Sequence, residues 1–220
     1  MIELIVFLGN YGHEYENTRH NVAWLFEKSL SFTSGLNWQN KYRGEFAQAD
    51  YADIISKMCD AGLLKRRDNG SLPVPEDAPR KLYFLKPLTY MNLSGEAIAE
   101  TANFFKIEPK NILIVHDEIE LPLGTVSLKW GGGLGGHNGL RSSKASLGTA
   151  DFWRLRFGVG KPLNGNVADY VLGNFTSDEN IALSQVFSVT HWLFAKVLTA
   201  KDAQKLLGEW SKKKVIQDAR

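Results

Sequence analysis

Apolar positions along this chain recur with two different periods. Continuous apolar runs typical of buried strands occupy residues 2–8, 81–85 and 111–115, and shorter runs occupy 126–129 and 155–159. Residues 44–57 alternate well enough for one or two further strands. Helical spacing of apolar residues appears at 22–30, 93–105, 186–198 and 203–210. Strands that alternate with helices predict an α/β fold, with a twisted, mostly parallel mixed sheet and helices on both faces.

One segment interrupts this pattern. Residues 58–80 contain Pro73, Pro75 and Pro79 together with a basic triplet at 65–67. A connection this long is unusual in a compact domain, so we expect an inserted, exposed excursion there. The length of 220 residues otherwise predicts a single domain spanning 1–220, with C-terminal helices in 177–220.

Composition is that of a soluble globular protein, with 44% hydrophobic and 23% charged residues. No continuous apolar run approaches the length of a membrane span, and no signal peptide is apparent at the start. The only cysteine, Cys59, cannot form an internal disulfide and fits a reducing compartment. We therefore expect a cytoplasmic protein that does not enter a membrane.

The net charge of +2 is too small to indicate a nucleic-acid partner, but the charge is unevenly distributed. Residues 121–165 hold one acid, Asp151, and six basic residues: Lys129, Arg141, Lys144, Arg154, Arg156 and Lys161. Such a stretch could hold a phosphate backbone, and a solvated basic face would give the same pattern.

Polar side chains gather at three places where predicted strands end. The first is the segment 9–21, which follows the opening strand and carries Asn10, Tyr15 and His20. The second is 116–118, directly after the strand at 111–115, and the third is 89–92, after the strand at 81–85. Open α/β sheets bind ligands at the carboxyl ends of their strands, so we expect these three places to converge on one site.

The chemistry of these residues favours an activated water. A histidine oriented by an aspartate is an effective base near neutral pH, and His20 with Asp117 is the pair we favour. His13, His116 and His191 are expected to have structural roles, His116 by pairing with a neighbouring carbonyl. No nucleophile elbow and no metal-binding spacing appear in the sequence. The amides of Asn10, Asn92 and Asn138 could orient a substrate and donate to an oxyanion.

A glycine-rich segment is the second dense motif. Five of the six residues in 131–136 are glycine, and His137 and Asn138 follow. Glycines let a backbone approach a ligand closely, and a helix beginning near Asn138 would direct free N–H groups at an anion. The segment lacks the ending of a P-loop, and a flexible hairpin would have the same composition.

Taken together, these motifs resemble the bacterial-type peptidyl-tRNA hydrolase family. Six stretches occur in the family's order and cover about residues 2–175: 9–21, 85–95, 116–124, 131–140, 154–160 and 169–172. The resemblance implies a monomeric α/β enzyme without metal or cofactor. Its reaction would be hydrolysis of the ester between a peptide and the terminal ribose of its tRNA.

The resemblance also implies a role for individual residues. His20 would activate water and Asp117 would hold its imidazole. Asn10 and Asn92 would grip the end of the peptide and help to place the water or to stabilise the oxyanion. Met91, His137 and Asn138 would line the same cleft, with Tyr15 at its mouth. Lys129 and Arg156 would hold the 5′-phosphate and acceptor stem of peptidyl-tRNA. No membrane and no obligate protein partner are implied.

The chain departs from the family's pattern in three places. Ala23 replaces a common glycine, Tyr90 stands where phenylalanine is common, and 58–80 looks inserted. Two other functions remain open at this point. One is a catalytically inactive RNA-binding relative of the same fold, comparable to splicing factors. The other is a hydrolase of a small ester or amide, for which the basic stretch and the glycine segment would be unnecessary.

Overall fold

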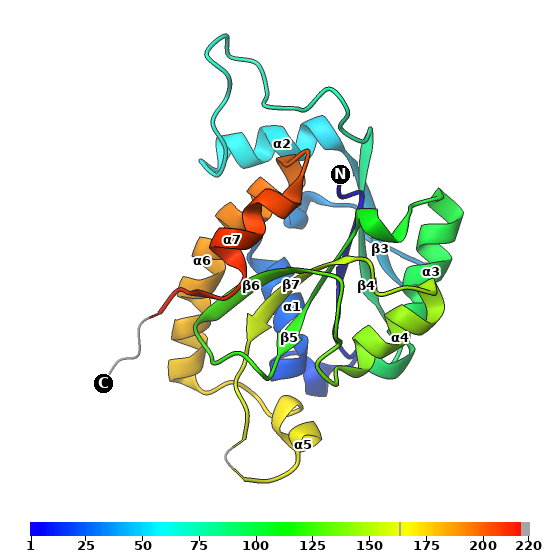
Figure 1. Ribbon diagram of the computed structural model, residues 1–220, viewed down its shortest axis with the longest axis vertical. Helices are drawn as coiled ribbons and strands as arrows, with labels where there is room; N and C mark the ends of the chain where they lie inside the picture. Colours follow the sequence, from blue (N-terminus) through cyan, green and yellow to red (C-terminus); the bar gives the residue numbers. More distant parts are fainter. Residues whose placement is uncertain (163, 217–220) are drawn as a thin grey trace.

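The computed structural model describes residues 1–162 and 164–216, and its centre is one mixed sheet of eight strands (Figure 1). The strands lie in the order β2-β3-β4-β1-β5-β7-β6-β8. Their bounds are β1 Leu4–Phe7, β2 Gln39–Lys41, β3 Gly44–Asp50, β4 Lys81–Pro87, β5 Ile112–Glu118, β6 Thr125–Trp130, β7 Trp153–Gly158 and β8 Lys213–Lys214.

Parallel pairing is confined to the four central strands. β1 pairs in parallel with β4 and with β5, and β5 pairs in parallel with β7. The outer pairs β2–β3, β3–β4, β6–β7 and β6–β8 are antiparallel. Because parallel strands end on the same edge, the segments after β1, β4 and β5 meet at one edge of the sheet.

Helices cover both faces of the sheet. On one face lie α1 (Val22–Ser29), α2 (Tyr51–Asp60), α6 (Ser177–Thr199) and α7 (Leu207–Trp210), whose buried residues share one apolar cluster with that face. α3 (Ser94–Phe105) and α4 (Asn138–Leu147) cover the other face and form a second cluster with it. The short α5 (Val167–Val171) lies apart from both layers, at the bottom of Figure 1. These features confirm the predicted α/β fold.

Six 3-10 helices complete the described secondary structure. They are η1 His13–Tyr15, η2 Arg19–Asn21, η3 Thr33–Gly35, η4 Met91–Leu93, η5 Pro109–Asn111 and η6 Ala203–Leu206. η2 and η4 lead directly into α1 and α3, so each of these two strand-to-helix connections ends in a tight turn.

α3 and α4 approach each other closely at a glycine. A Cβ placed on Gly95 would lie 2.1 Å from the carbonyl oxygen of Ser142, which no side chain could tolerate. The amide of Gly95 donates to the hydroxyl of Ser142 at 2.8 Å. The contact fixes α4, and with it the end of the glycine segment, against the start of α3.

Two sequence expectations were wrong in detail. Residues 44–57 form one strand, β3, and then the first turns of α2, because Tyr51, Ile54, Ile55 and Met58 form a buried helical stripe. His116 and Asp117 lie within β5 rather than after it, since β5 extends to Glu118 beside β7.

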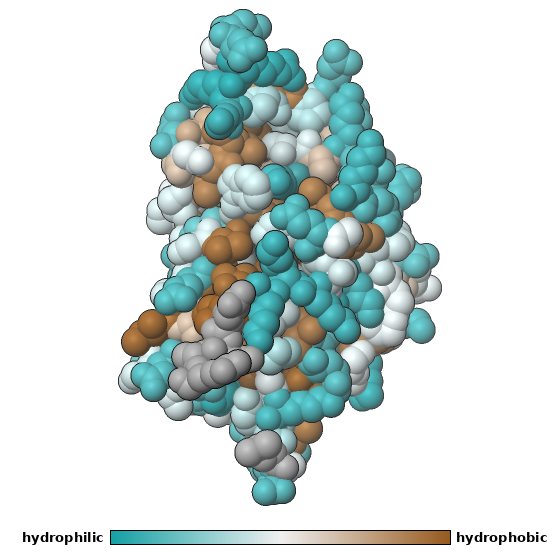
Figure 2. All heavy atoms as spheres, turned by 60° about the vertical axis from the view of Figure 1, so that its left-hand side comes forward, coloured by the Kyte–Doolittle hydropathy of each residue, from teal (hydrophilic) through white to brown (hydrophobic). Residues whose placement is uncertain are grey.

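Residues 61–80 form neither helix nor strand and lie at the mainly hydrophilic upper end of the molecule (Figure 2). That this excursion is an insertion stays a prediction.

α6 is long and apolar enough to cross a membrane, since an 18-residue window of it has a mean hydropathy of 1.3. Polar residues interrupt its sequence, which is why no continuous apolar run reveals it. Half of that window is buried inside the protein, and Leu183, Phe187 and Phe194 belong to the apolar cluster on the sheet. α6 is therefore a core helix.

Candidate active site

The predicted pair of His20 and Asp117 comes together at the edge where the central strands end. His20 lies in η2, in the connection from β1 to α1, and Asp117 is the penultimate residue of β5. The His20 Nδ1 and Asp117 Oδ1 atoms are 2.8 Å apart. Asp117 is almost fully buried, and the His20 side chain is about 11% exposed. An ionised carboxylate only accepts hydrogen bonds, so Nδ1 carries the proton and Nε2 keeps its lone pair.

His137 provides a second hydrogen bond to the same carboxylate oxygen. It is the N-cap of α4, and its Nδ1 accepts from the backbone N–H groups of Gly139 and Leu140 at 3.1 and 3.4 Å. Its proton must therefore be on Nε2, which lies 3.0 Å from Asp117 Oδ1 and donates to it. Both ring nitrogens of His137 are thus taken by protein partners, although its ring lines the cleft.

The electrostatics of this cluster favour a charged Asp117 beside a readily protonated His20. Burial opposes ionisation of Asp117, but His20 and His137 outweigh it and hold the pKa of Asp117 well below its usual range. Burial also lowers the pKa of His20, and the charge of Asp117 with its hydrogen bond reverses this, so that the pKa of His20 is raised.

A third histidine touches the cluster without joining it. His116 is fully buried, and its Nδ1 donates to the Asp117 carbonyl at 2.6 Å, which is the structural role predicted for it. Burial holds the pKa of His116 well below its usual range, so this ring stays neutral. His191 hydrogen-bonds Ser29 on the α6 side of the sheet, and His13 is exposed.

His20, Asp117 and His137 could in principle hold a metal ion, since one ligand atom from each lies within 4.8 Å of the others. The two His–Asp distances of 2.8 and 3.0 Å are those of direct hydrogen bonds. Ligands of a tetrahedral zinc ion at about 2.0–2.2 Å would stand roughly 3.3 Å or more apart. The present geometry therefore fits a hydrogen-bonded triad better than a metal site.

The triad opens into a cleft of about 690 Å³. Its lining brings together most of the predicted site residues, from three strand ends, the glycine segment and α5: Asn10, Tyr15, His20, Tyr90, Met91, Asn92, Asp117, Glu118, Ile119, Gly135, Gly136, His137, Asn138, Val167, Ala168, Val171 and Leu172. The predicted convergence of the segments at 9–21, 89–92 and 116–118 is confirmed.

Asn10 has its orientation fixed by the protein. Its Oδ1 accepts from the backbone N–H of Met91 at 3.1 Å, so its amide NH₂ is the end left for a ligand. The backbone of Asn10 is held in turn by Asn21, which accepts from the Asn10 N–H at 2.8 Å and donates to its carbonyl at 2.9 Å. Asn92 and Asn138 are exposed and line the same cleft, with Tyr15 partly exposed beside them.

Three cations of the basic stretch, Lys129, Arg154 and Arg156, form a cluster beside this cleft, on β6 and β7, whereas Arg141 and Lys144 lie on α4. Lys129 and Arg154 face each other across these strands, next to the pair of Ser127 and Arg156. Arg156 is buried, with its Nη1 3.3 Å from a Glu118 oxygen and its Nη2 donating to Ser127 at 2.7 Å. Its Nη2 also donates to the Ser211 carbonyl at 3.4 Å, so the structure already gives this predicted phosphate contact three protein partners.

Arg154 was missed as an individual site residue. It is 1% exposed, and its Nη1 donates to the Gly133 carbonyl at 2.8 Å. Its Nε and Nη2 have no hydrogen-bond partner among the described residues, and burial with the charge of Arg156 lowers its pKa to about 10. A Cβ on Gly132 would lie 3.7 Å from Lys129 Cε and 3.9 Å from Arg154 Nη2. The glycine segment thus covers two cations for which the described residues provide no ion-pair partner, although the charge of Glu118 acts on both. Such an arrangement is suited to an anion.

Arg19 precedes His20 in η2, and its side chain is held by residues near the start of α6. Its guanidinium binds both carboxylate oxygens of Glu179, at 3.0 and 2.8 Å, and lies 4.4 Å from the centre of the Tyr170 ring. Glu179 belongs to the capping box that begins α6. Arg19 therefore connects the segment that holds His20 to the segment that carries α5. The residues in contact are about 150 positions apart in the sequence, so no local motif predicts this contact.

Comparisons with known proteins agree on one family. The family model described as "Peptidyl-tRNA hydrolase" matches residues 4–218. The peptidyl-tRNA hydrolase of Treponema pallidum is 43% identical over 98% of this chain and 97% of its own length. That of Desulfitobacterium hafniense is 38% identical over 87% and 92%. A crystal structure of peptidyl-tRNA hydrolase from Acinetobacter baumannii superposes with a TM-score of 0.74 at 31% identity, covering 94% of this chain and 93% of that one.

Proposed function

Because this chain belongs to the peptidyl-tRNA hydrolase family and is a carboxylic ester hydrolase, we propose that His20 activates the water that cleaves peptidyl-tRNA. The observation that carries this proposal is the 2.8 Å bond from His20 Nδ1 to the buried Asp117, which leaves Nε2 as a base in the cleft. Asp117 and His137 are positioning groups in this account, and no metal or cofactor is required.

The reaction balances with these groups alone. His20 Nε2 takes a proton from water as the water oxygen attacks the ester carbonyl, and Asp117 stabilises the imidazolium that forms. The tetrahedral oxyanion then accepts hydrogen bonds from the Asn10 NH₂, whose orientation the Met91 amide fixes, and from the exposed amides of Asn92 or Asn138. When the intermediate collapses, the imidazolium gives its proton to the departing ribose oxygen.

The tRNA would be held beside the cleft through its phosphates. Lys129 is the predicted contact, and the buried Nη2 of Arg154, beneath Gly132, would add its positive charge to the same site. Arg156 would act with them, either directly or by keeping Glu118 neutralised at the edge of the cleft. We propose a 5′-phosphate or acceptor-stem phosphate as the occupant. A monomeric state and a cytoplasmic location remain predictions.

Selectivity for a peptidyl ester over an aminoacyl ester would follow from the asparagine amides. A peptidyl substrate offers a peptide bond to Asn10 and Asn92, whereas an aminoacyl ester offers a charged amine and leaves these amides unpaired. An inactive RNA-binding protein would not need a base, a carboxylate that orients it, or an open cleft, and this chain has all three. A hydrolase of a small neutral ester would not need the cations Lys129 and Arg154 beside the cleft.

A direct assay tests the proposal. The purified protein should release the acyl group from an N-acetyl-aminoacyl-tRNA and spare the same tRNA with an unblocked amino acid. His20→Ala should abolish release and leave binding of deacylated tRNA within about twofold, because His20 faces the ester and not the cations. Near-normal turnover by His20→Ala would refute its role as the base.

A further inference from the structure

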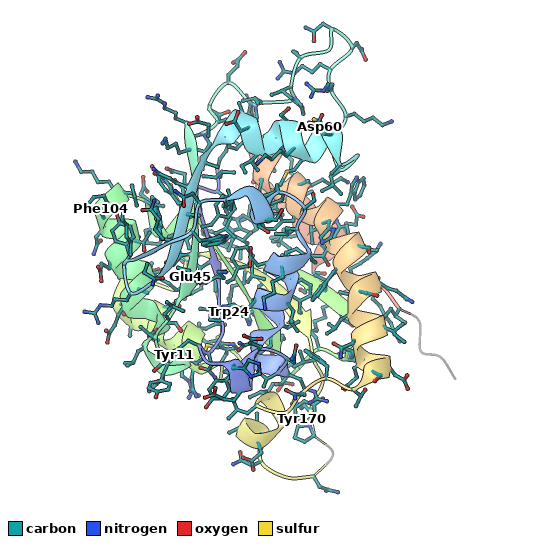
Figure 3. All side chains as sticks on the ribbon, turned by 180° about the vertical axis from the view of Figure 1, so that it is seen from behind. Tyr11, Trp24, Glu45, Asp60, Phe104 and Tyr170 are labelled. Atoms are coloured by element: carbon teal, nitrogen blue, oxygen red, sulfur yellow. The ribbon has the colours of Figure 1, made fainter. Side chains whose placement is uncertain are left out.

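An exposed pair of aromatic rings lies at the rim of the cleft without a role in the mechanism. Tyr11 directly follows Asn10, and Tyr90 directly precedes Met91. Their ring centres are 5.4 Å apart with planes tilted by 43°. Tyr11 is 40% exposed and Tyr90 57% exposed. Figure 3 shows Tyr11 on the outer surface near α4, with Tyr170 marking α5 at a separate place.

The two rings stand on backbone that the site already fixes. The Asn10 Oδ1 accepts from the Met91 amide, so the segments after β1 and β4 are joined next to both tyrosines. Asn21 holds Asn10 from the other side, and Met91 itself is buried. Large rings on a fixed backbone lose little conformational entropy when they bind a ligand, which makes them effective contact residues.

The order of the strands in the sheet indicates that the peptide part of the substrate, and not the tRNA part, reaches these rings. Tyr90 follows β4 and Tyr11 follows β1. The His20–Asp117 pair joins the segment after β1 to β5. Of the cations, Arg154 and Arg156 lie on β7 and Lys129 lies on β6. These strands are neighbours in the sheet in that order. If the phosphates of the tRNA lie on the β6–β7 side and the ester lies at His20, the peptide must extend toward β1 and β4.

We propose that Tyr11 and Tyr90 form an aromatic subsite for an apolar side chain of the peptide, at the residue before the esterified one. This inference rests on the proposed function. Asn10 and Asn92 are assigned to the peptide bond next to the ester, and the residue beyond that bond would meet the rings beside them. Tyr90 lines the cleft itself and Tyr11 packs against its ring, so an apolar side chain that leaves the cleft there meets both rings.

The experiment uses N-acetyl-dipeptidyl-tRNAs that share one tRNA and one esterified alanine. The residue before the alanine is phenylalanine, leucine or glycine, and kcat/KM for peptide release is measured for each. We expect the wild type to favour phenylalanine over glycine by about tenfold, the order of discrimination that one apolar contact gives.

Variants then connect this preference to the rings. Tyr11→Ser and Tyr90→Ser should each reduce the ratio to about three or less, whereas Tyr90→Phe should keep it. Phe104→Ser is the matched control, because Phe104 is an exposed aromatic residue of α3 away from Tyr11 (Figure 3). Its ratio should equal that of the wild type. As a check without variants, acetyl-Phe-Ala-amide should inhibit the wild type more strongly than acetyl-Gly-Ala-amide.

The outcomes separate this inference from the function on which it rests. No peptide release from any of the three substrates would refute the proposed function. Release with a wild-type ratio near one, or with a ratio unchanged in both serine variants, would refute the aromatic subsite alone. Weaker binding of deacylated tRNA by both serine variants, with an unchanged ratio, would also refute it and assign the rings to a nucleobase.

Discussion

Replacing Asp117 by asparagine tests the electrostatic role of the carboxylate directly. The change keeps the size of the side chain and an oxygen able to accept hydrogen bonds from His20 and His137, but it removes the charge. Two unit charges about 4 Å apart interact by roughly 4 kcal/mol at an effective dielectric constant near 20. The His20–Asp117 pair is well buried, so most of that stabilisation of the imidazolium would be lost. We expect kcat to fall by about 10²–10³-fold.

The pH dependence gives a second, independent readout. His20 must be neutral to accept a proton, and Asp117 raises its pKa against the effect of burial. In the wild type, kcat/KM should therefore fall on the acid side with a midpoint above the ordinary histidine value of about 6.5. In Asp117→Asn the raising effect of the charge is lost and only a hydrogen bond to a neutral oxygen opposes burial, so the pKa of His20 falls and the midpoint should move to a lower pH.

The assay is release of labelled acetyl-amino acid from its tRNA between pH 5 and 8, with spontaneous hydrolysis subtracted. Asp68→Asn, at an exposed position in the excursion, is the control and should match the wild type in rate and midpoint. An Asp117→Asn enzyme that keeps the wild-type midpoint and loses less than tenfold in kcat would refute this reasoning.

Three further predictions concern the surroundings of the site. Lys129→Ala should weaken tRNA binding and reduce the slope of log K against log salt by about 1, because one phosphate contact is lost; an unchanged slope in binding titrations would exclude that contact. Arg19→Met should lower the free energy of unfolding by about 2–3 kcal/mol in urea titrations, since Glu179 loses its ion-pair partner and keeps only the Thr176 N–H; a change under 0.5 kcal/mol would contradict this. Gly95→Ala should lower the free energy of unfolding by about 3 kcal/mol or prevent folding, because its Cβ would meet the Ser142 carbonyl. A thermal midpoint equal to that of the wild type would disprove the close contact.

Local sequence determined the elements that depend on local periodicity. The strand at β1, the helix α3 and the start of α4 after the glycine segment all follow from apolar spacing and from residues that favour a turn. The error at 44–57 has a local explanation. Residues 44–50 alternate as a strand does, but Tyr51, Ile54, Ile55 and Met58 have the i, i+3, i+4, i+7 spacing of a helix, a signal in the sequence that the strand prediction did not weigh.

The pairing of His20 with Asp117 could also be predicted, because both residues follow or end parallel strands that must finish on one edge. The sequence could not determine where each polar group carries its proton or which partner it binds. The tautomer of His137 depends on capping α4, and the availability of Arg156 depends on Glu118 from another strand. The free nitrogens of Arg154 depend on which carbonyl of the glycine segment lies above it.

These features share a physical reason. Periodicity and turn chemistry act over a few residues, so the sequence by itself determined which elements form and which chemical groups reach the sheet edge. Hydrogen bonds and ion pairs are satisfied by whichever groups the fold brings within about 3 Å, often from segments more than a hundred residues away, as with Arg19 and Glu179. The tertiary structure alone decided which of those groups are occupied by protein partners and which remain free for a substrate.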